Sequence, residues 1–147
     1  MKIYLASDHA GFELKEKIAK MLIEAGLEVI DKGAHELNPK DDYPGFMRLA
    51  AEPLTKEKDA RAIVLGGSGQ GEAMAANRFK GVRAAIYYGG SLDIIKLSRE
   101  HNDANVLSLG ARFLSEDEAK TAVKLWLETK FSGDERHKRR INALDTF

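Results

Sequence analysis

The segment from Gly66 to Gly71 is well suited to hold negatively charged oxygen atoms. It reads Gly-Gly-Ser-Gly-Gln-Gly, and Glu72 and a helix-like run follow it directly. Glycines let consecutive backbone amides turn toward one anion, and a helix N-terminus behind them adds partial positive charge. The carboxylate of Glu72 could therefore remove a proton while the amides stabilise the oxyanion that forms. The alternative for Glu72 is an ordinary first-turn acid that interacts with the helix dipole.

This glycine loop differs from the common nucleotide-binding patterns. No Gly-Lys-Ser/Thr ends the loop, so it is not a P-loop, and its glycines at 67, 69 and 71 do not fit G-x-G-x-x-G. A nucleotide-binding or regulatory module that uses the loop alone stays open as an alternative. Such a module would bind nucleotides and would not depend on Glu72.

Two other segments carry a histidine beside an acid or an amide. Residues 7–11 read Ser-Asp-His-Ala-Gly and follow an apolar run, so Asp8 and His9 arrive together at the end of a predicted strand. Asp8 could instead only cap the helix that begins there. His101 and Asn102 end a predicted helix and precede a strand, a position less clearly near the ligand-binding edge. A lone histidine at a helix end is more often a cap than a catalyst.

Three arginines could bind an anion. Arg112 leaves the fifth predicted strand, where open parallel sheets bind ligands. Arg136 and Arg140 are four residues apart and would lie on one helical face, from which they could grip a phosphate. On spacing alone, a solvated basic tail or a weak nucleic-acid patch explains this pair slightly better. An RNA-binding tail would show an affinity that falls steeply with salt.

Strands and helices alternate along the chain between these segments. Most of the strand-length apolar runs lack polar alternation, as expected of strands covered on both faces. They are residues 3–6, 27–30, 62–65, 84–87 and 105–109. The first predicted helix stops at Gly26, and the last begins at Ser115. Weaker helices are predicted over about 45–57, 70–79 and 90–101, the first of these interrupted near Pro53. In this last helix the Ser115 hydroxyl should cap the amide of Glu118, whose carboxylate reaches back.

This alternation predicts a three-layer α/β/α, Rossmann-like domain with a five-stranded parallel sheet. We expect one domain over residues 1–147, with a main body of about 1–130 and a C-terminal arm of about 131–147. The arm is polar and basic with few apolar positions, so it should form a helix that packs beyond the main sheet. A partner subunit is one candidate for that surface.

The composition excludes several classes of protein. The 147 residues include no cysteine, which rules out disulfides, thiolate metal sites and a cysteine nucleophile. The 23 basic and 23 acidic side chains balance, so no overall field attracts nucleic acid or anionic lipid. The apolar start of the chain is too short for a signal peptide, and no run approaches the ~20 apolar residues of a membrane span. We expect a cytoplasmic protein without metal, cofactor, nucleic-acid partner or membrane partner.

Taken together, the segments resemble the ribose-5-phosphate isomerase B family, which includes bacterial galactose-6-phosphate and allose-6-phosphate isomerases. The resemblance spans nearly the whole chain and is carried by residues 6–12, 42–44, 67–71, 75–77, 81–84, 99–105 and 136–140. Many members place a cysteine base directly before the glycine loop, where this sequence has Gly66. Glu72 after the loop resembles the branch of the family that uses a glutamate base.

The resemblance implies an aldose–ketose isomerase that interconverts ribose 5-phosphate and ribulose 5-phosphate through an enediolate. In that reaction Glu72 would move a proton between the first two carbons and His101 would open the sugar ring. The amides of Gly67, Ser68, Gly69, Gln70 and Gly71 would hold the enediolate oxygens, with the Ser68 side chain beside them.

The resemblance also implies how the rest of the substrate is held. Asp8 and Asn102 would orient hydroxyl groups, and Tyr43 would line the pocket. The phosphate would be surrounded by His9, Arg112, Arg136 and Arg140. The family further implies a homodimer, or a tetramer, whose sites combine residues of two subunits. A six-carbon or four-carbon sugar phosphate stays open as the substrate, because pocket depth rather than the catalytic residues would decide it.

Overall fold

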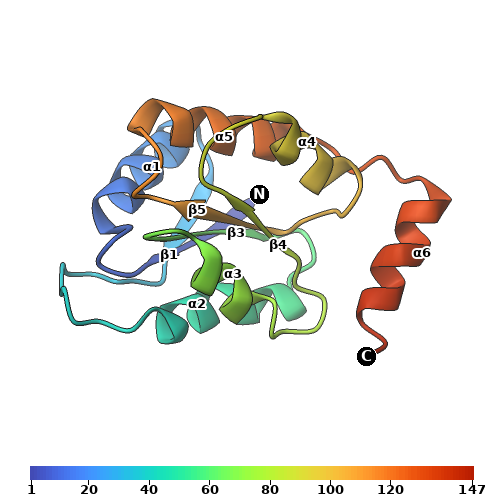
Figure 1. The fold of residues 1–147 in the computed structure, drawn as a ribbon, viewed down its shortest axis with the longest axis horizontal. Helices are drawn as coiled ribbons and strands as arrows, with labels where there is room; N and C mark the ends of the chain where they lie inside the picture. The colour runs from blue at the N-terminus through green and yellow to red at the C-terminus, as the bar shows by residue number, and fades with distance from the viewer.

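The computed structural model describes all 147 residues and contains one five-stranded sheet (Figure 1). The strands lie in the order β2-β1-β3-β5-β4, and every neighbouring pair is parallel. Their bounds are β1 Lys2–Ser7, β2 Glu28–Asp31, β3 Arg61–Gly66, β4 Ala84–Tyr87 and β5 Val106–Gly110. The three central strands are almost wholly buried, which explains why their sequences are apolar without alternation.

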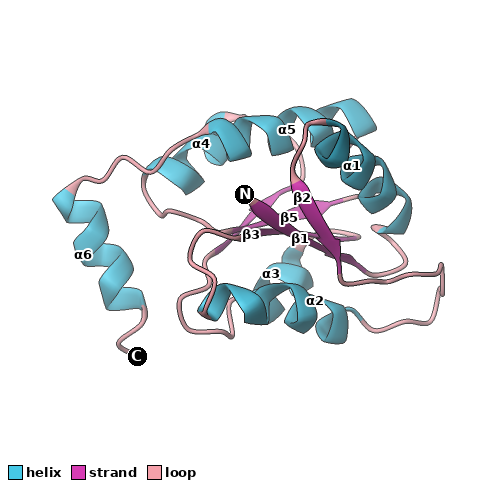
Figure 2. Ribbon diagram, turned by 180° about the vertical axis from the view of Figure 1, so that it is seen from behind, coloured by secondary structure: helices cyan, strands magenta, loops and turns pink.

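Helices cover both faces of this sheet (Figures 1 and 2). One face carries α1 (Phe12–Glu24), α4 (Asp93–Glu100) and α5 (Glu116–Glu128). The other face carries α2 (Tyr43–Ala51), the 3-10 turn η1 (Glu52–Thr55) and α3 (Gln70–Ala76). Each face has its own apolar core, with Trp126 and Ile18 buried in the first and Met47 and Leu54 in the second. The predicted three-layer α/β/α architecture is therefore confirmed.

Local signals in the sequence set several element ends. Ser115 and Glu118 form the expected capping box, because the Ser115 hydroxyl accepts from the Glu118 amide at 3.1 Å and the Glu118 carboxylate accepts from the Ser115 amide at 2.8 Å. Gly26 follows α1 with a φ of +79°, a conformation that other residues rarely adopt. The predicted interruption near Pro53 is the change from α2 to η1.

The neighbouring strands β1 and β3 send their chains to opposite faces of the sheet. The chain leaving β1 enters α1 on one face, and the chain leaving β3 enters α3 on the other (Figure 1). Such a divergence opens a crevice at the carboxyl ends of two parallel strands, which is the usual ligand site of open α/β sheets. The same edge receives the loop that leaves β5, the other neighbour of β3.

The last helix, α6 (Glu135–Leu144), lies outside the three layers, beyond the end of α4 (Figures 1 and 2). The amide of Ser132 donates to the carbonyl of Glu100 at 3.1 Å, and the amide of Gly81 donates to Oδ1 of Asp145 at 2.9 Å. These bonds hold the segment before the helix and the segment after it. The helix is polar, as predicted, and His137 is its only buried residue. None of the helices combines the length and the apolar character that crossing a bilayer requires.

Candidate active site

Asp8 and the start of α1 pack tightly against the end of β3. The Asp8 amide donates to the Leu65 carbonyl at 3.3 Å, and Oδ1 of Asp8 accepts from the amides of Ala10 and Gly11 at 2.9 and 3.2 Å. A β-carbon on Gly11 would lie only 2.6 Å from Cβ of Leu65, so only glycine permits this approach. Asp8 therefore stabilises the turn that precedes α1, whose own N-cap, Gly11, has no side-chain cap bond, and the buried carboxylate of Asp8 lies at the carboxyl ends of β1 and β3.

The carboxylate of Glu72 fills the space beside Gly66 where a side chain would otherwise be. A β-carbon on Gly66 would overlap the Glu72 carboxylate, with Oε2, the farther of its two oxygens, 2.5 Å away. Glu72 is on the first turn of α3, while Gly66 ends β3, so the glycine loop folds the acid back over the strand end. Gly66 and Glu72 thus form one unit: the missing side chain at 66 makes room for the acid at 72.

The surroundings of Glu72 make it a stronger base than an exposed glutamate. The residue is 4% exposed, and burial raises the pKa of its carboxyl group above the ordinary value. The negative charge of Asp8 raises this pKa further, while hydrogen bonds from backbone amides oppose the rise. A carboxylate whose pKa is raised toward the working pH takes up a proton more readily and can still lose it.

The glycine loop is held rigidly while two of its amides stay free. The carbonyls of Gly66 and Gly67 accept from the amides of Ala111 and Arg112 at 2.8 and 3.1 Å, and the Ser108 hydroxyl donates to the Gly69 carbonyl at 2.6 Å. The amides of residues 67 and 68 donate to no group within the chain. Fixed carbonyls and free amides are the features that a preorganised oxyanion site requires.

Two more of the predicted residues lie against the same loop. The ring of Tyr43, at the start of α2, lies against Gly71, where a β-carbon would be 2.6 Å from the tyrosine hydroxyl oxygen. The guanidinium of Arg112 lies beside Gly67, with its Nη1 3.1 Å from the position of a β-carbon there. His9 lies at the same edge of the sheet, where its ring bonds to Asp41. The carboxyl edge of one chain therefore assembles Asp8, His9, Tyr43, residues 67–71, Glu72 and Arg112.

The other predicted residues lie at the opposite edge of the sheet. His101 and Asn102 follow α4, which runs back from the end of β4 to the start of β5. The His101 ring stacks on His137 of α6, with centroids 4.3 Å apart and planes 17° apart. Burial, together with the nearby charge of His101, lowers the pKa of His137. Arg136 and Arg140 are on the same helix and are exposed.

The segment after His101 is anchored by two arginines that sequence reasoning did not single out. Arg83 donates from Nε to the carbonyl of Asn102 at 2.9 Å and from Nη2 to that of Asp103 at 2.8 Å. Arg99 donates to Oδ1 of Asp103 at 2.8 Å and to the carbonyl of Ala104. Asp103 has a φ of +45°, which this anchoring maintains. The only sequence signal for Arg83 was its place in the 81–84 block.

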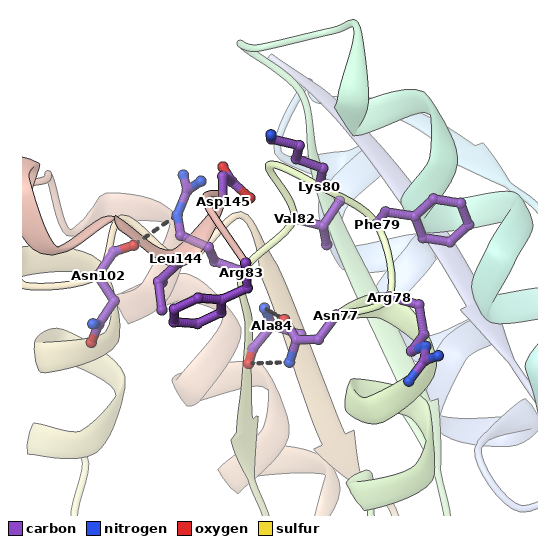
Figure 3. A pocket seen from close by; sticks show the side chains of 11 residues that line it. Asn77, Arg78, Phe79, Lys80, Val82, Arg83, Ala84, Asn102, Leu144 and Asp145 are labelled. Carbon is purple, nitrogen blue, oxygen red and sulfur yellow. Dashed lines mark hydrogen bonds between the residues drawn. The ribbon is translucent and has the colours of Figure 1, made fainter. Parts of the chain in front are cut away.

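A pocket of about 560 Å³ lies beside this second group of residues (Figure 3). Figure 3 shows Arg83 bonded to Asn102 on one side of the pocket and Asn77 bonded to the backbone of Ala84 on the other. Leu144 and Asp145 also line the pocket. A second hollow, of about 400 Å³, lies on the outer face of α2 and α3 beside Tyr43 and Gly71. Neither includes Asp8 or Glu72, so within one chain the two groups of predicted residues do not share a pocket.

One cluster offers donors of the kind that bind metal ions. Asp8, His9 and Asp41 each have a ligand atom, and these atoms lie within 4.8 Å of one another. Oδ1 of Asp8 already accepts two backbone amides, and Oδ1 of Asp41 already accepts from His9. Because these oxygens are engaged with protein donors, the arrangement fits an internally bonded polar cluster better than an open set of ligands.

Comparison with known proteins gives consistent matches over the whole length. Residues 3–144 match the family model described as Ribose/Galactose Isomerase. The chain is 43% identical to ribose-5-phosphate isomerase B of Mycolicibacterium paratuberculosis over 98% of this chain and 89% of that protein. It is 38% identical to ribose-5-phosphate isomerase B of Escherichia coli, over 97% and 93%. The crystal structure of the Mycoplasma genitalium ribose-5-phosphate isomerase B with bound ribulose 5-phosphate superposes with a TM-score of 0.92, at 39% identity over 97% and 93% of the two chains.

Proposed function

The chain belongs to the ribose/galactose isomerase family, and from this premise we propose that it interconverts ribose 5-phosphate and ribulose 5-phosphate. Relatives at 38–43% identity carry the name ribose-5-phosphate isomerase B, and one structural neighbour holds ribulose 5-phosphate. The observation that carries the proposal in this chain is the position of Glu72, a buried acid with a raised pKa beside the free amides of the glycine loop.

In the proposed reaction Glu72 transfers a proton between two adjacent carbons. The carboxylate takes the proton from C2 of the open-chain aldose, and the electron pair of the broken C–H bond forms the enediolate. The same group returns the proton to C1, while a second proton passes from O2 to O1, beside which the Ser68 hydroxyl is placed. The free amides of Gly67 and Ser68 stabilise the negative charge on the enediolate oxygens, the type of interaction that accelerates such reactions most.

The remaining site residues hold the substrate and prepare it. His101 opens the furanose ring by proton transfer, and Asp8 and Asn102 orient hydroxyl groups. Tyr43 lines the pocket, and the phosphate is bound by His9, Arg112, Arg136 and Arg140. Binding the phosphate far from the reacting carbons supplies energy that aligns the C2–H bond with the Glu72 carboxylate.

We further propose that each site combines two subunits. Glu72 and the glycine loop are at the carboxyl edge of the sheet, whereas His101 and α6 are at the amino edge, so one chain cannot apply both to one sugar. Ile94, Leu97 and His101 fall on one face of α4 by their spacing of three and four, and Ile94 and Leu97 are 53% and 41% exposed. A second copy that covers this apolar face would meet His101 directly.

The first test is turnover of ribose 5-phosphate by the purified protein in the presence of a chelator. Allose 6-phosphate and galactose 6-phosphate are assayed in parallel. Preferential turnover of the five-carbon sugar supports the proposal, and turnover of a six-carbon sugar alone would retain the mechanism but change the substrate. Absence of turnover with all three would contradict the proposed function.

A mixing experiment tests the shared site. Glu72→Gln and His101→Asn are each expected to be inactive as homodimers. After subunit exchange, half of the dimers are mixed and one of their two sites has both wild-type residues, so activity should recover to about a quarter of the wild-type value. If each site were built within one chain, the mixture would stay as inactive as its components.

A further inference from the structure

Asp41 makes two hydrogen bonds to His9, one of the proposed phosphate ligands. Its Oδ1 accepts from the backbone amide of His9 at 3.1 Å and lies 2.7 Å from Nδ1 of the His9 ring. The Asp41 side chain is 7% exposed and the His9 side chain is 29% exposed. The carboxylate of Asp41 is therefore buried, whereas the ring that it bonds is partly exposed.

The chemistry of this pair decides which nitrogen of His9 is available. An ionised carboxylate has no proton to donate, so the ring must donate from Nδ1. Nε2 is then the one ring nitrogen free to meet a ligand, and the second bond to the backbone amide stops the carboxylate from rotating away. We propose that Asp41 is a positioning residue that fixes the ring of His9 so that Nε2 faces the phosphate of the substrate. This inference rests on the proposed function, in which His9 is a phosphate ligand.

The loop that carries Asp41 is itself fixed to the end of β1. The amide of Ser7 donates to the Gly33 carbonyl at 2.7 Å, and the amide of Ala34 returns a bond to the Ser7 carbonyl at 2.8 Å. Farther along, the Asp41 amide donates to the Asn38 carbonyl at 3.1 Å. Two residues later Tyr43 lies against the glycine loop. One short segment therefore positions a group at the phosphate end and another at the reacting end of the site.

The environment of Asp41 is that of a functional group rather than a stabilising one. Its second oxygen, Oδ2, is buried and has no hydrogen-bond partner. A buried carboxylate with an unpaired oxygen costs stability, because the desolvation of that oxygen is not compensated. Removing the charge while keeping an acceptor for both His9 bonds, as Asp41→Asn does, should therefore leave the fold as stable as before or more so. A purely structural role for Asp41 would give the opposite result.

The chain offers a matched control beside the test position. Asp42 is exposed, and its side chain makes no capping hydrogen bond to α2. We would compare Asp41→Ala, Asp41→Asn and Asp42→Asn with wild type and with His9→Ala. The side-chain amide oxygen that Asp41→Asn introduces can still accept from both His9 groups, so that variant keeps the shape if the alanine variant does not fold.

The kinetic readouts are the Michaelis constant for ribose 5-phosphate and the inhibition constant for inorganic phosphate. We expect Asp41→Ala to raise both constants about tenfold, in line with the lower end of the loss seen when the hydrogen-bond partner of a metal-ligating histidine is removed, with kcat nearly unchanged. Asp41→Asn should raise them less, and Asp42→Asn should change neither. Adding Asp41→Ala to His9→Ala should cause no further loss, since Asp41 acts through His9.

A spectroscopic readout separates this inference from the proposed function. The chain has four histidines, so the ring nitrogen signals of His9 can be assigned by NMR through the loss of one set in His9→Ala. Wild type should show a protonated Nδ1 that Asp41→Ala loses, and added inorganic phosphate should shift Nε2 of His9. These outcomes can be observed even if the protein turns over no sugar phosphate. Losses that multiply in the double variant, a fall in kcat alone, or an unchanged His9 spectrum in Asp41→Ala would overturn the inference.

Discussion

Adding one methyl group at residue 66 should inactivate the enzyme without unfolding it. In Gly66→Ala the new β-carbon overlaps the Glu72 carboxylate, whose farther oxygen lies 2.5 Å from it, whereas ordinary contacts begin at 3.4 Å. The backbone at residue 66 is in strand β3 and does not have the positive φ that only glycine adopts easily. The side chain that must yield is therefore Glu72, because the alanine itself is not strained.

The size of the effect follows from how far the acid must move. The nearer oxygen overlaps more deeply than the farther one, so the carboxylate must shift by more than about 1 Å to restore ordinary contacts. A misplacement of about 1 Å in a catalytic group already lowers the rate by about 10²-fold. Alanine is also favoured over glycine within a strand by roughly 0.5–1 kcal/mol, which offsets part of the crowding. We expect kcat to fall about a hundredfold while the Michaelis constant and the melting temperature change little.

The assay is steady-state isomerisation together with thermal unfolding, with Gly45→Ala as the matched control. A β-carbon at Gly45 in α2 meets no atom within 4 Å, so this variant should keep full activity and be as stable as wild type or slightly more. Combining Gly66→Ala with Glu72→Gln should give no loss beyond that of Glu72→Gln. Full activity in Gly66→Ala, or two losses that multiply, would show that Glu72 is not the group displaced.

Four further predictions concern the base, the phosphate site and the fold. Glu72→Gln should lower kcat by about 10²–10⁴-fold and still bind substrate, and near-normal turnover would contradict the assignment. Burial raises the pKa of Glu72, so the folded wild-type protein loses stability as that group ionises. The stability advantage of Glu72→Gln over wild type should therefore grow from pH 4 to neutral pH. The raised pKa should also place the acidic limb of the kcat profile above the ordinary glutamate value, and a limb at or below that value would refute it. Arg140→Ala should raise the Michaelis constant strongly with little change in kcat, and an unchanged constant would remove Arg140 from the phosphate site. Ser115→Ala should cost about 1 kcal/mol of unfolding free energy by removing the cap of α5 while the kinetics stay as in wild type, and an unchanged melting temperature would contradict the capping role.

The elements of the fold could be predicted because each carries its own local signal. Strands β1, β3 and β5 are buried on both faces, so their residues are apolar in succession, and Gly26 and Ser115 mark helix ends through conformations or bonds that few other residues supply. The strand order carries no such signal. β5 lies between β3 and β4 because of packing between segments far apart in the chain. Local patterns could not reveal this order.

The residues at the carboxyl edge of the candidate site could be predicted from the sequence. Parallel strands end together at one edge, so residues that follow β1, β3 and β5 must meet there, as Asp8, the glycine loop and Arg112 do. Asp41 follows no strand directly, and its position depends on the path of a polar loop that the sequence does not specify. The fit between Gly66 and Glu72 was equally hidden, because it depends on how sharply residues 67–71 turn.

His101, which we propose opens the sugar ring, does not follow the end of a strand. The sequence placed His101 after a helix and before a strand, and the structure puts it at the amino edge, stacked on His137. Glu72 lies at the carboxyl edge, so within one chain His101 is too far away to act on the same sugar. In the symmetric dimer that we propose, the amino edge of one subunit would face the carboxyl edge of the other, so a residue that looks misplaced in the monomer would be correctly placed in the pair. A chemically capable side chain at the wrong edge of an open sheet, with exposed apolar residues on its own helix face, is therefore evidence for a shared site.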